Sequence, residues 1–122
     1  MENCDPDVIH LSNALLLGLA HQLSERLNVP VVCSLQDEDV WVDVMKPSAR
    51  DSVWKLMSTK GEYVSTFISV SDYYAGMMKE KMDIPESKLG TVHIGVDPAD
   101  YTFRLATEKK RNIGYVSRMC HE

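Results

Sequence analysis

The stretch from Thr66 to Asp97 constrains the fold of this 122-residue chain more than any other. It opens with a β-branched and aromatic run, Thr66–Val70, which is typical of a buried strand. A helical segment follows, and Pro85 ends it because proline disfavours the helical conformation in the residue before it. A second apolar run, Leu89–Ile94, leads to a turn at Gly95. A strand, a crossover helix and a second strand normally form a right-handed parallel pair, so the stretch predicts a βαβ unit.

Helical spacing predicts three helices in the first two thirds of the chain. The first follows Ser12 and Asn13, either of which can cap it, the second begins at Pro47, and the third follows Ser71 or Asp72. Each is expected to turn one apolar face inward. The residues expected on these faces are Leu16, Leu19 or Ala20, Leu23 and Leu27 in the first helix, Ala49, Val53, Leu56 and Met57 in the second, and Tyr74, Met77, Met78 and Met82 in the third.

Short apolar runs between these helices predict the strands. They are Asp7–Leu11, Val29–Leu35, Thr66–Val70, Leu89–Ile94 and Asn112–Val116. Strands that alternate with helices indicate an α/β fold, a Rossmann-like parallel sheet with helices on both faces. Polar residues and glycine gather where the strands end, at His10, Ser12, Ser34, Gln36, Ser69, Ser71, Gly95 and Asp97. All these ends share the carboxyl edge of a parallel sheet, outside which ligands of open α/β sheets bind.

Charge and cysteine content exclude several classes of protein. The net charge of −5 argues against nucleic acid as the main partner, because phosphate binding needs clustered Lys and Arg. Three widely spaced cysteines do not form a disulfide framework, which favours a reducing, cytoplasmic location. No apolar run approaches the roughly 20 residues that span a bilayer, so no transmembrane segment is expected. A peripheral membrane association of an intact enzyme stays open.

Several motifs occur in an order that resembles one enzyme family. They are Pro-Asp-Val-Ile-His at 6–10, Pro-Val-Val at 30–32, Val-Ser at 70–71, Ile-Pro-Glu-Ser-Lys at 84–88, Gly-Val-Asp at 95–97 and Ile-Gly-Tyr-Val-Ser-Arg at 113–118. Together they resemble the glycosyltransferases of family four, which are two-domain enzymes of the GT-B class. The resemblance implies part of the N-terminal, acceptor-side domain in residues 1–103. It implies a linker and the first strand of the nucleotide-sugar domain in residues 104–122.

The resemblance also implies an activity, the transfer of a sugar from a nucleotide-sugar to an unknown acceptor with retention of configuration. Such enzymes generally need no metal or other cofactor for the chemistry. Most of the donor site would lie beyond residue 122, so we expect these 122 residues alone to be inactive. The open edge of an incomplete sheet is expected to favour self-association, because its backbone donors and acceptors are unpaired.

Strand-end position and the resemblance together give the candidate site residues. The candidates for the acceptor or the cleft are His10, Ser12, Gln36, Glu38, Ser71 and Gly95. Arg118 is the candidate for the donor diphosphate, because a guanidinium binds two phosphate oxygens at once. Many relatives carry histidine at the position of Gln36 and glycine at that of Ser117, so this chain departs from the family there.

Structural roles compete with these assignments. Ser71 suits a helix N-cap, Gly95 suits a turn with positive φ, and Glu38 and Asp39 suit a solvated acidic turn. No metal site is expected, because Cys120 and His121 have no second pair at zinc-ligand spacing. A different class is also open, a small flavodoxin-like binding or receiver module. Such a module needs paired acidic residues after its first strand, and this chain has His10, Leu11 and Ser12 there.

Overall fold

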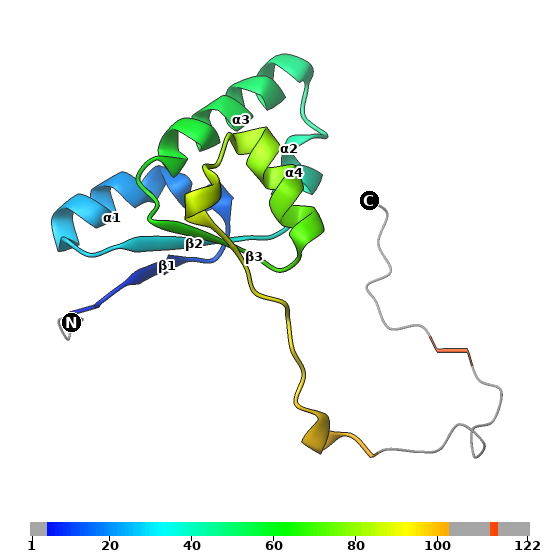
Figure 1. The fold of residues 1–122 in the computed structure, drawn as a ribbon. Helices are drawn as coiled ribbons and strands as arrows, with labels where there is room; N and C mark the ends of the chain where they lie inside the picture. The colour runs from blue at the N-terminus through cyan, green and yellow to red at the C-terminus, as the bar shows by residue number, and fades with distance from the viewer. Residues whose placement is uncertain (1–4, 103–112, 115–122) are drawn as a thin grey trace.

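A computed structural model describes residues 5–102 and 113–114 of the chain. Its strands are β1 (Ile9–Leu11), β2 (Val31–Leu35), β3 (Thr66–Ser69) and β4 (Leu89–Thr91). They form one parallel sheet in the order β1-β2-β3-β4. The helices are η1 (Ala14–Leu19), α1 (Ala20–Leu27), α2 (Glu38–Val42), α3 (Pro47–Gly61), α4 (Asp72–Met82), η2 (Glu86–Lys88) and η3 (Pro98–Asp100), as Figure 1 shows. The predicted Rossmann-like parallel α/β sheet is confirmed.

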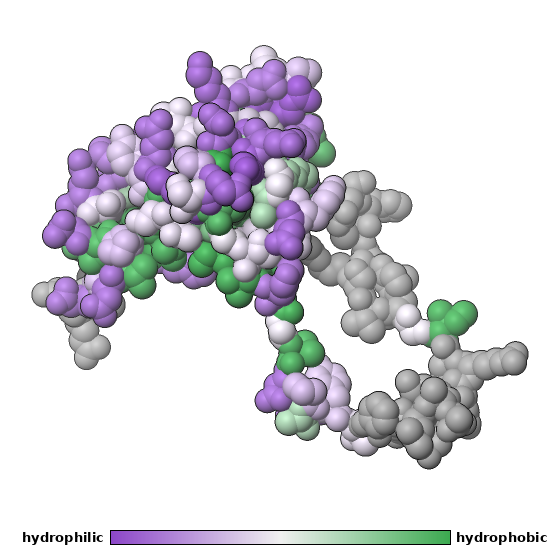
Figure 2. Space-filling view, viewed as in Figure 1, coloured by the Kyte–Doolittle hydropathy of each residue, from purple (hydrophilic) through white to green (hydrophobic). Residues whose placement is uncertain are grey.

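The crossover helices η1, α1, α2, α3 and α4 form one layer on one face of the sheet, whereas η3, which follows β4, lies apart from them (Figure 1). α1 packs against α3, α3 packs against α4, and all lie on the same side of the strands (Figure 1). The strand order explains this, because right-handed crossovers that always step in the same direction place every helix on the same face. The second helical layer that was expected on the opposite face is not found within residues 5–102 and 113–114. The helical layer turns polar side chains to solvent, and hydrophobic atoms gather along the lower rim of the body (Figure 2).

Burial along the strands follows this one-sided packing. In β2, Val31, Cys33 and Leu35 are fully buried, whereas Val32 and Ser34, which point to the other face, are only half-buried. The largest core side chains that meet this covered face come from η1, β3 and α4, and they are Leu17, Phe67, Met78 and Met82. The alternation is typical of a sheet with one face packed and one face open.

The predicted helix starts are confirmed, because the expected residues cap or begin the helices. Asn13 accepts a hydrogen bond from the Leu15 N–H at the start of η1, and Ser71 accepts one from the Tyr74 N–H at the start of α4. Pro47 occupies the first turn of α3. Asn28 ends α1 in the left-handed conformation, with φ of 53°.

The predicted inner face of the first helix is partly wrong. Leu16, Leu19 and Leu27 are 40%, 51% and 45% exposed, whereas Ala14, Leu17 and Ala20 are buried and Leu23 packs against the core. The cause is the helix type, because residues 14–19 form a 3-10 helix with about three residues per turn. A spacing of three brings Ala14, Leu17 and Ala20 to the same side.

The inner faces of α3 and α4 also differ in part from the prediction. In α3, Trp54, Met57 and Gly61 are buried, whereas Leu56 is 56% exposed. Ala49 is exposed and Val53 packs at the edge of the core. Trp54 is the largest side chain in the helix, and the inner face of α3 is the face that buries it. The spacing of the aliphatic residues alone predicted a different face. In α4 the buried residues are Ala75, Met78 and Met82, with Tyr74 and Met77 half-buried.

The last predicted strands are shorter than expected or lie outside the described residues. β4 ends at Thr91, because β3 ends at Ser69 and the last bond between them joins the Val92 N–H to the Ser69 carbonyl at 2.8 Å. Ile94 is therefore 79% exposed. Gly95 does not have positive φ, so the predicted turn there is wrong. The predicted strand Asn112–Val116 falls mostly outside the described residues.

Candidate functional site

The carboxyl edge of the sheet brings together candidates from segments far apart in the sequence. Ser12 follows β1, Gln36 and Glu38 follow β2, and Ser71 follows β3. The parallel register aligns these strand ends, with Leu11 opposite Cys33 and Leu35 opposite Ser69. The Gln36 side-chain amide donates to the Ser12 carbonyl at 2.5 Å, which ties the first two loops together. Four of the six predicted acceptor candidates therefore share one edge.

Glu38 is the centre of this edge. Its side chain is fully buried, and its carboxylate accepts the Ala14 N–H at 2.7 Å and the Gln36 N–H at 2.8 Å. Tyr74 donates its hydroxyl to the same carboxylate at 2.8 Å. Glu38 thus joins η1, the loop after β2 and α4, and it is not part of a solvated turn. Its bonding pattern suits the positioning of the loops.

Tyr74 completes the network around Glu38. Its hydroxyl oxygen accepts the Glu38 N–H at 2.9 Å, and it also lies 2.9 Å from a carboxylate oxygen of Asp39. The single phenolic proton cannot satisfy both carboxylates at once. Burial and the adjacent Glu38 carboxylate raise the pKa of Tyr74 above its usual range, so it stays a neutral donor. Sequence reasoning treated Tyr74 as core and missed this role, although its position three residues after a capping serine was visible.

The serines at the end of β3 are used by the backbone of the helix start. Ser69 is fully buried and donates its hydroxyl to the Ser71 carbonyl at 2.9 Å. Ser71 in turn accepts the Tyr74 N–H at 3.2 Å, as its N-cap interpretation predicts. His93 lies beside this loop, with Nδ1 3.2 Å from the Val70 carbonyl. The loop after β3 is therefore held in place by local hydrogen bonds.

His10 lies on the open face of the sheet and not in the carboxyl-edge network. It is exposed within β1, and its Nε2 lies 2.8 Å from the Ser34 hydroxyl. Both side chains point away from the helical layer, because their strand neighbours Leu11, Cys33 and Leu35 point into it. Gly95 lies beyond the end of β4 in an extended segment, with open space around its Cα. Arg118 lies outside the described residues.

The carboxyl edge is acidic and has no Lys or Arg in the described loops, and His93 is the one histidine in them. Residues 12–13, 36–39, 69–72 and 91–93 contain no Lys or Arg. The same loops contain Asp37, Glu38, Asp39 and Asp72. Such an edge repels phosphate groups and offers hydroxyl, amide and carboxylate partners to a neutral polar ligand. In the part of the chain that the structure describes, no set of three His, Cys, Asp or Glu side chains is placed to hold a metal ion.

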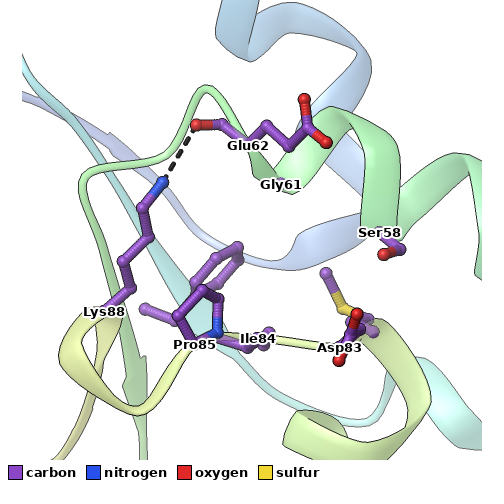
Figure 3. Close-up of a pocket in the computed structure, with 9 residues that line it drawn as sticks. Ser58, Gly61, Glu62, Asp83, Ile84, Pro85 and Lys88 are labelled. Atoms are coloured by element: carbon purple, nitrogen blue, oxygen red, sulfur yellow. Dashed lines mark hydrogen bonds between the residues drawn. The ribbon is translucent and has the colours of Figure 1, made fainter.

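A separate pocket of about 220 Å³ opens at the other, amino edge of the sheet. Phe67, Met82 and Ile84 are among its lining residues and are nearly fully buried. At its rim, Lys88 donates to the Glu62 carbonyl at 2.9 Å and to the Val64 carbonyl at 2.8 Å (Figure 3). None of the predicted site residues lines this pocket, so the candidate site and the pocket are distinct.

Comparison with known proteins identifies the family. The described part of the chain contains no helix of the length and apolarity that a bilayer span requires. The comparison with curated proteins gave no significant match. The family model described as Glycosyltransferase Family 4 matches residues 1–100, which is most of the chain. The parallel α/β sheet and this match agree, and the chain belongs to glycosyltransferase family 4.

Proposed function

We propose that this chain forms the acceptor side of a retaining glycosyltransferase of the GT-B class. In this reaction the bond from the sugar C1 to the nucleotide diphosphate breaks, and the diphosphate leaves with the electron pair. An acceptor hydroxyl gives its proton to the departing diphosphate oxygen and its oxygen bonds to C1, with no resident metal or cofactor. The family match supports sugar transfer, and the remaining assignments rest on the site chemistry.

The single observation that carries the acceptor role is the charge of the carboxyl edge. A nucleotide diphosphate is best held by Lys or Arg, and the loops at 12–13, 36–39, 69–72 and 91–93 contain neither. A sugar or alcohol acceptor needs hydrogen-bond partners at short range, and Ser12, Gln36 and Ser71 lie at that edge. We therefore assign the donor diphosphate to another part of the protein. Arg118, in the proposed donor-side segment 104–122, is its candidate contact.

The alternative flavodoxin-like receiver module is not favoured. In that fold the strand order is 2-1-3-4-5, with the first strand inside the sheet, whereas β1 here pairs only with β2 within the described residues. The first strand is followed by Ser12 and Asn13, which do not provide the acidic pair that holds magnesium. Labelling of the chain by acetyl phosphate in the presence of magnesium would reverse this preference.

Ligand titration of the 122-residue chain, followed by amide NMR, tests the proposal. Methyl glycosides are expected to shift the amides of Ser12, Gln36 and Ser71, and UDP and GDP are expected to leave them in place. Gln36→Ala should weaken glycoside binding, and Ser52→Ala, on the exposed side of α3, is the matched control. UDP binding at this edge, or sugar transfer from a UDP- or GDP-sugar by the purified chain alone, would contradict the assignment.

The donor half of the proposal needs a protein in which this segment is joined to a nucleotide-sugar domain. There Arg118→Ala should weaken donor binding, because it removes a charge-assisted contact worth roughly 1.5–3 kcal/mol. Gln36→Ala, at the carboxyl edge, should act mainly on the acceptor or on turnover. Lys109→Ala, in the proposed linker, is the control and should do little. If Lys109→Ala abolished donor binding and Arg118→Ala did not, the proposed boundary between residues 103 and 104 would be wrong.

A further inference from the structure

An exposed apolar stripe borders the carboxyl edge, on α2 and the turn that follows it. Its residues are Val40, Trp41, Val44 and Met45, which are 41%, 64%, 80% and 40% exposed. The turn continues the helical path, because the Asp43 N–H bonds to the Asp39 carbonyl and the Met45 N–H bonds to the Val42 carbonyl. At helical spacing, positions 40, 41, 44 and 45 lie along one side.

The other two sides of this segment are occupied, so the stripe is held on a fixed element. Glu38 and Val42 are fully buried and anchor the segment to the body. Asp39 and Asp43 form a second side that faces α4, where the Tyr74 hydroxyl lies 2.9 Å from Asp39 and Lys81 donates to Asp43. The stripe thus points away from α4.

The stripe adjoins the candidate site. α2 starts at Glu38, which follows the loop at the end of β2 (Figure 1). Glu38 also accepts the Ala14 N–H, so the start of η1 lies against the same residue. Leu15 and Leu16, which follow Ala14 in the sequence, are 44% and 40% exposed. An acceptor hydroxyl at the carboxyl edge would therefore have apolar surface beside it.

Charge and size indicate what covers the stripe. Asp37 and Asp39 lie at its start and Lys46 follows Met45 at its end, so the stripe has no basic cluster beside it, and the net charge of −5 disfavours an anionic lipid surface. The four side chains expose on the order of a few hundred Å², below the roughly 800 Å² that each partner contributes to a standard protein interface. Trp41 presents an aromatic face of the kind that packs on apolar chains and rings. A small amphipathic ligand fits these features best.

We propose that the stripe Val40, Trp41, Val44 and Met45 binds the apolar aglycone of the acceptor, an alkyl or aryl group attached to the glycosylated portion. This inference rests on the proposed acceptor role of the carboxyl edge. The hydroxyl-bearing part of the ligand lies against the polar loops, and the apolar part lies along α2. Acceptors without an apolar part bind more weakly because the stripe stays exposed to water.

Tryptophan fluorescence of the full 122-residue chain tests this inference. The chain has two tryptophans, and Trp54→Phe leaves Trp41 as the sole reporter. Octyl β-D-glucoside below its micelle concentration is expected to shift the Trp41 emission to the blue in a saturable way. Methyl β-D-glucoside should bind at least tenfold more weakly. Val44→Ser should weaken octyl glucoside binding at least fivefold, and Leu56→Ser, on α3 and 56% exposed, is the matched control.

The outcomes separate failure of this inference from failure of the proposed function. Equal affinity for methyl and octyl glucoside would overturn the inference and leave the acceptor role standing. Octanol binding as tightly as octyl glucoside would show an apolar site without sugar recognition, and it would overturn both. A blue shift that grows with protein concentration alone would assign the stripe to a second copy of the chain. A shift on phosphatidylcholine vesicles without glucoside would assign it to a membrane, and both results would overturn the inference.

Discussion

At each edge of the sheet one charged side chain forms hydrogen bonds to the backbone of the loops, but the two side chains are buried to different degrees. At the carboxyl edge, the Glu38 carboxylate accepts backbone N–H groups from two loops and is fully buried. At the amino edge, the Lys88 ammonium donates to two carbonyls after α3 and is only half-buried. Water can replace the bonds of Lys88 but cannot reach those of Glu38. The free energy of unfolding should therefore depend much more on Glu38 at the carboxyl edge than on Lys88 at the amino edge.

The largest expected effect is that of Glu38→Ala. The substitution leaves the Ala14 and Gln36 N–H groups without their partner and should destabilise the chain by about 3–5 kcal/mol. Urea unfolding followed by circular dichroism measures this loss. Glu86→Ala removes a carboxylate whose side chain is 80% exposed and should change stability by less than about 1 kcal/mol. Similar losses in the two variants would erase the distinction between buried and exposed carboxylates.

The second expected effect is a loss of stability at alkaline pH through Cys33. Burial, with a smaller effect of the Glu38 carboxylate, raises the pKa of the Cys33 thiol from 9.0 to about 12. Above pH 9 the unfolded chain releases this proton and the folded chain keeps it, so stability falls as pH rises from 9 to 12. The loss is at most about 1.4 kcal/mol per pH unit. Urea titrations between pH 8 and 11 should give a shallower fall for Cys33→Val, and parallel curves would contradict this burial effect.

The third prediction concerns Lys88 at the amino edge. Lys88→Ala should cost about 1 kcal/mol, because water replaces the ammonium at the Glu62 and Val64 carbonyls. Lys88→Met keeps most of the apolar stem beside the pocket and isolates the contribution of the charge. Thermal unfolding of both variants measures the difference. A loss of stability as large as that of Glu38→Ala would mean that the two edges depend equally on their charged side chains.

Much of the fold could be predicted from the sequence because local chemistry decides it. Asn13, Pro47 and Ser71 begin helices through their own local chemistry, and all four strands lie within the predicted short apolar runs. The one-sided helical layer could not be predicted, because it depends on strand order and not on composition. The buried face of the first helix could not be predicted from the sequence either. Residues 14–19 are Ala-Leu-Leu-Leu-Gly-Leu, which is apolar on every side and carries no periodic signal.

The candidate site was predicted in position but not in detail. The carboxyl edge follows from parallel strands alone, and Ser12, Gln36 and Ser71 do lie there. The bond between Tyr74 and Glu38 joins residues 36 positions apart, so no local pattern reports it. For the same reason, Glu38 resembled one member of a solvated acidic turn. Only the folded chain distinguishes it from its exposed neighbour Asp37.

The smallest expected effect comes from the ion pair of Asp43 and Lys81, which joins the turn after α2 to α4. The Asp43 and Lys81 side chains are 41% and 27% exposed, so the pair should contribute only about 0.2–1 kcal/mol. The hydrogen bond from Lys81 lowers the pKa of Asp43 below 3.8, so its contribution is present above pH 3.8 and is lost as pH falls further. Asp43→Asn should cost that amount at low salt and little at 1 M NaCl, whereas Asp51→Asn, at a 68% exposed side chain, should cost nothing measurable. A salt-independent loss above about 2 kcal/mol would mean that Asp43 acts through the Trp54 N–H and not through Lys81.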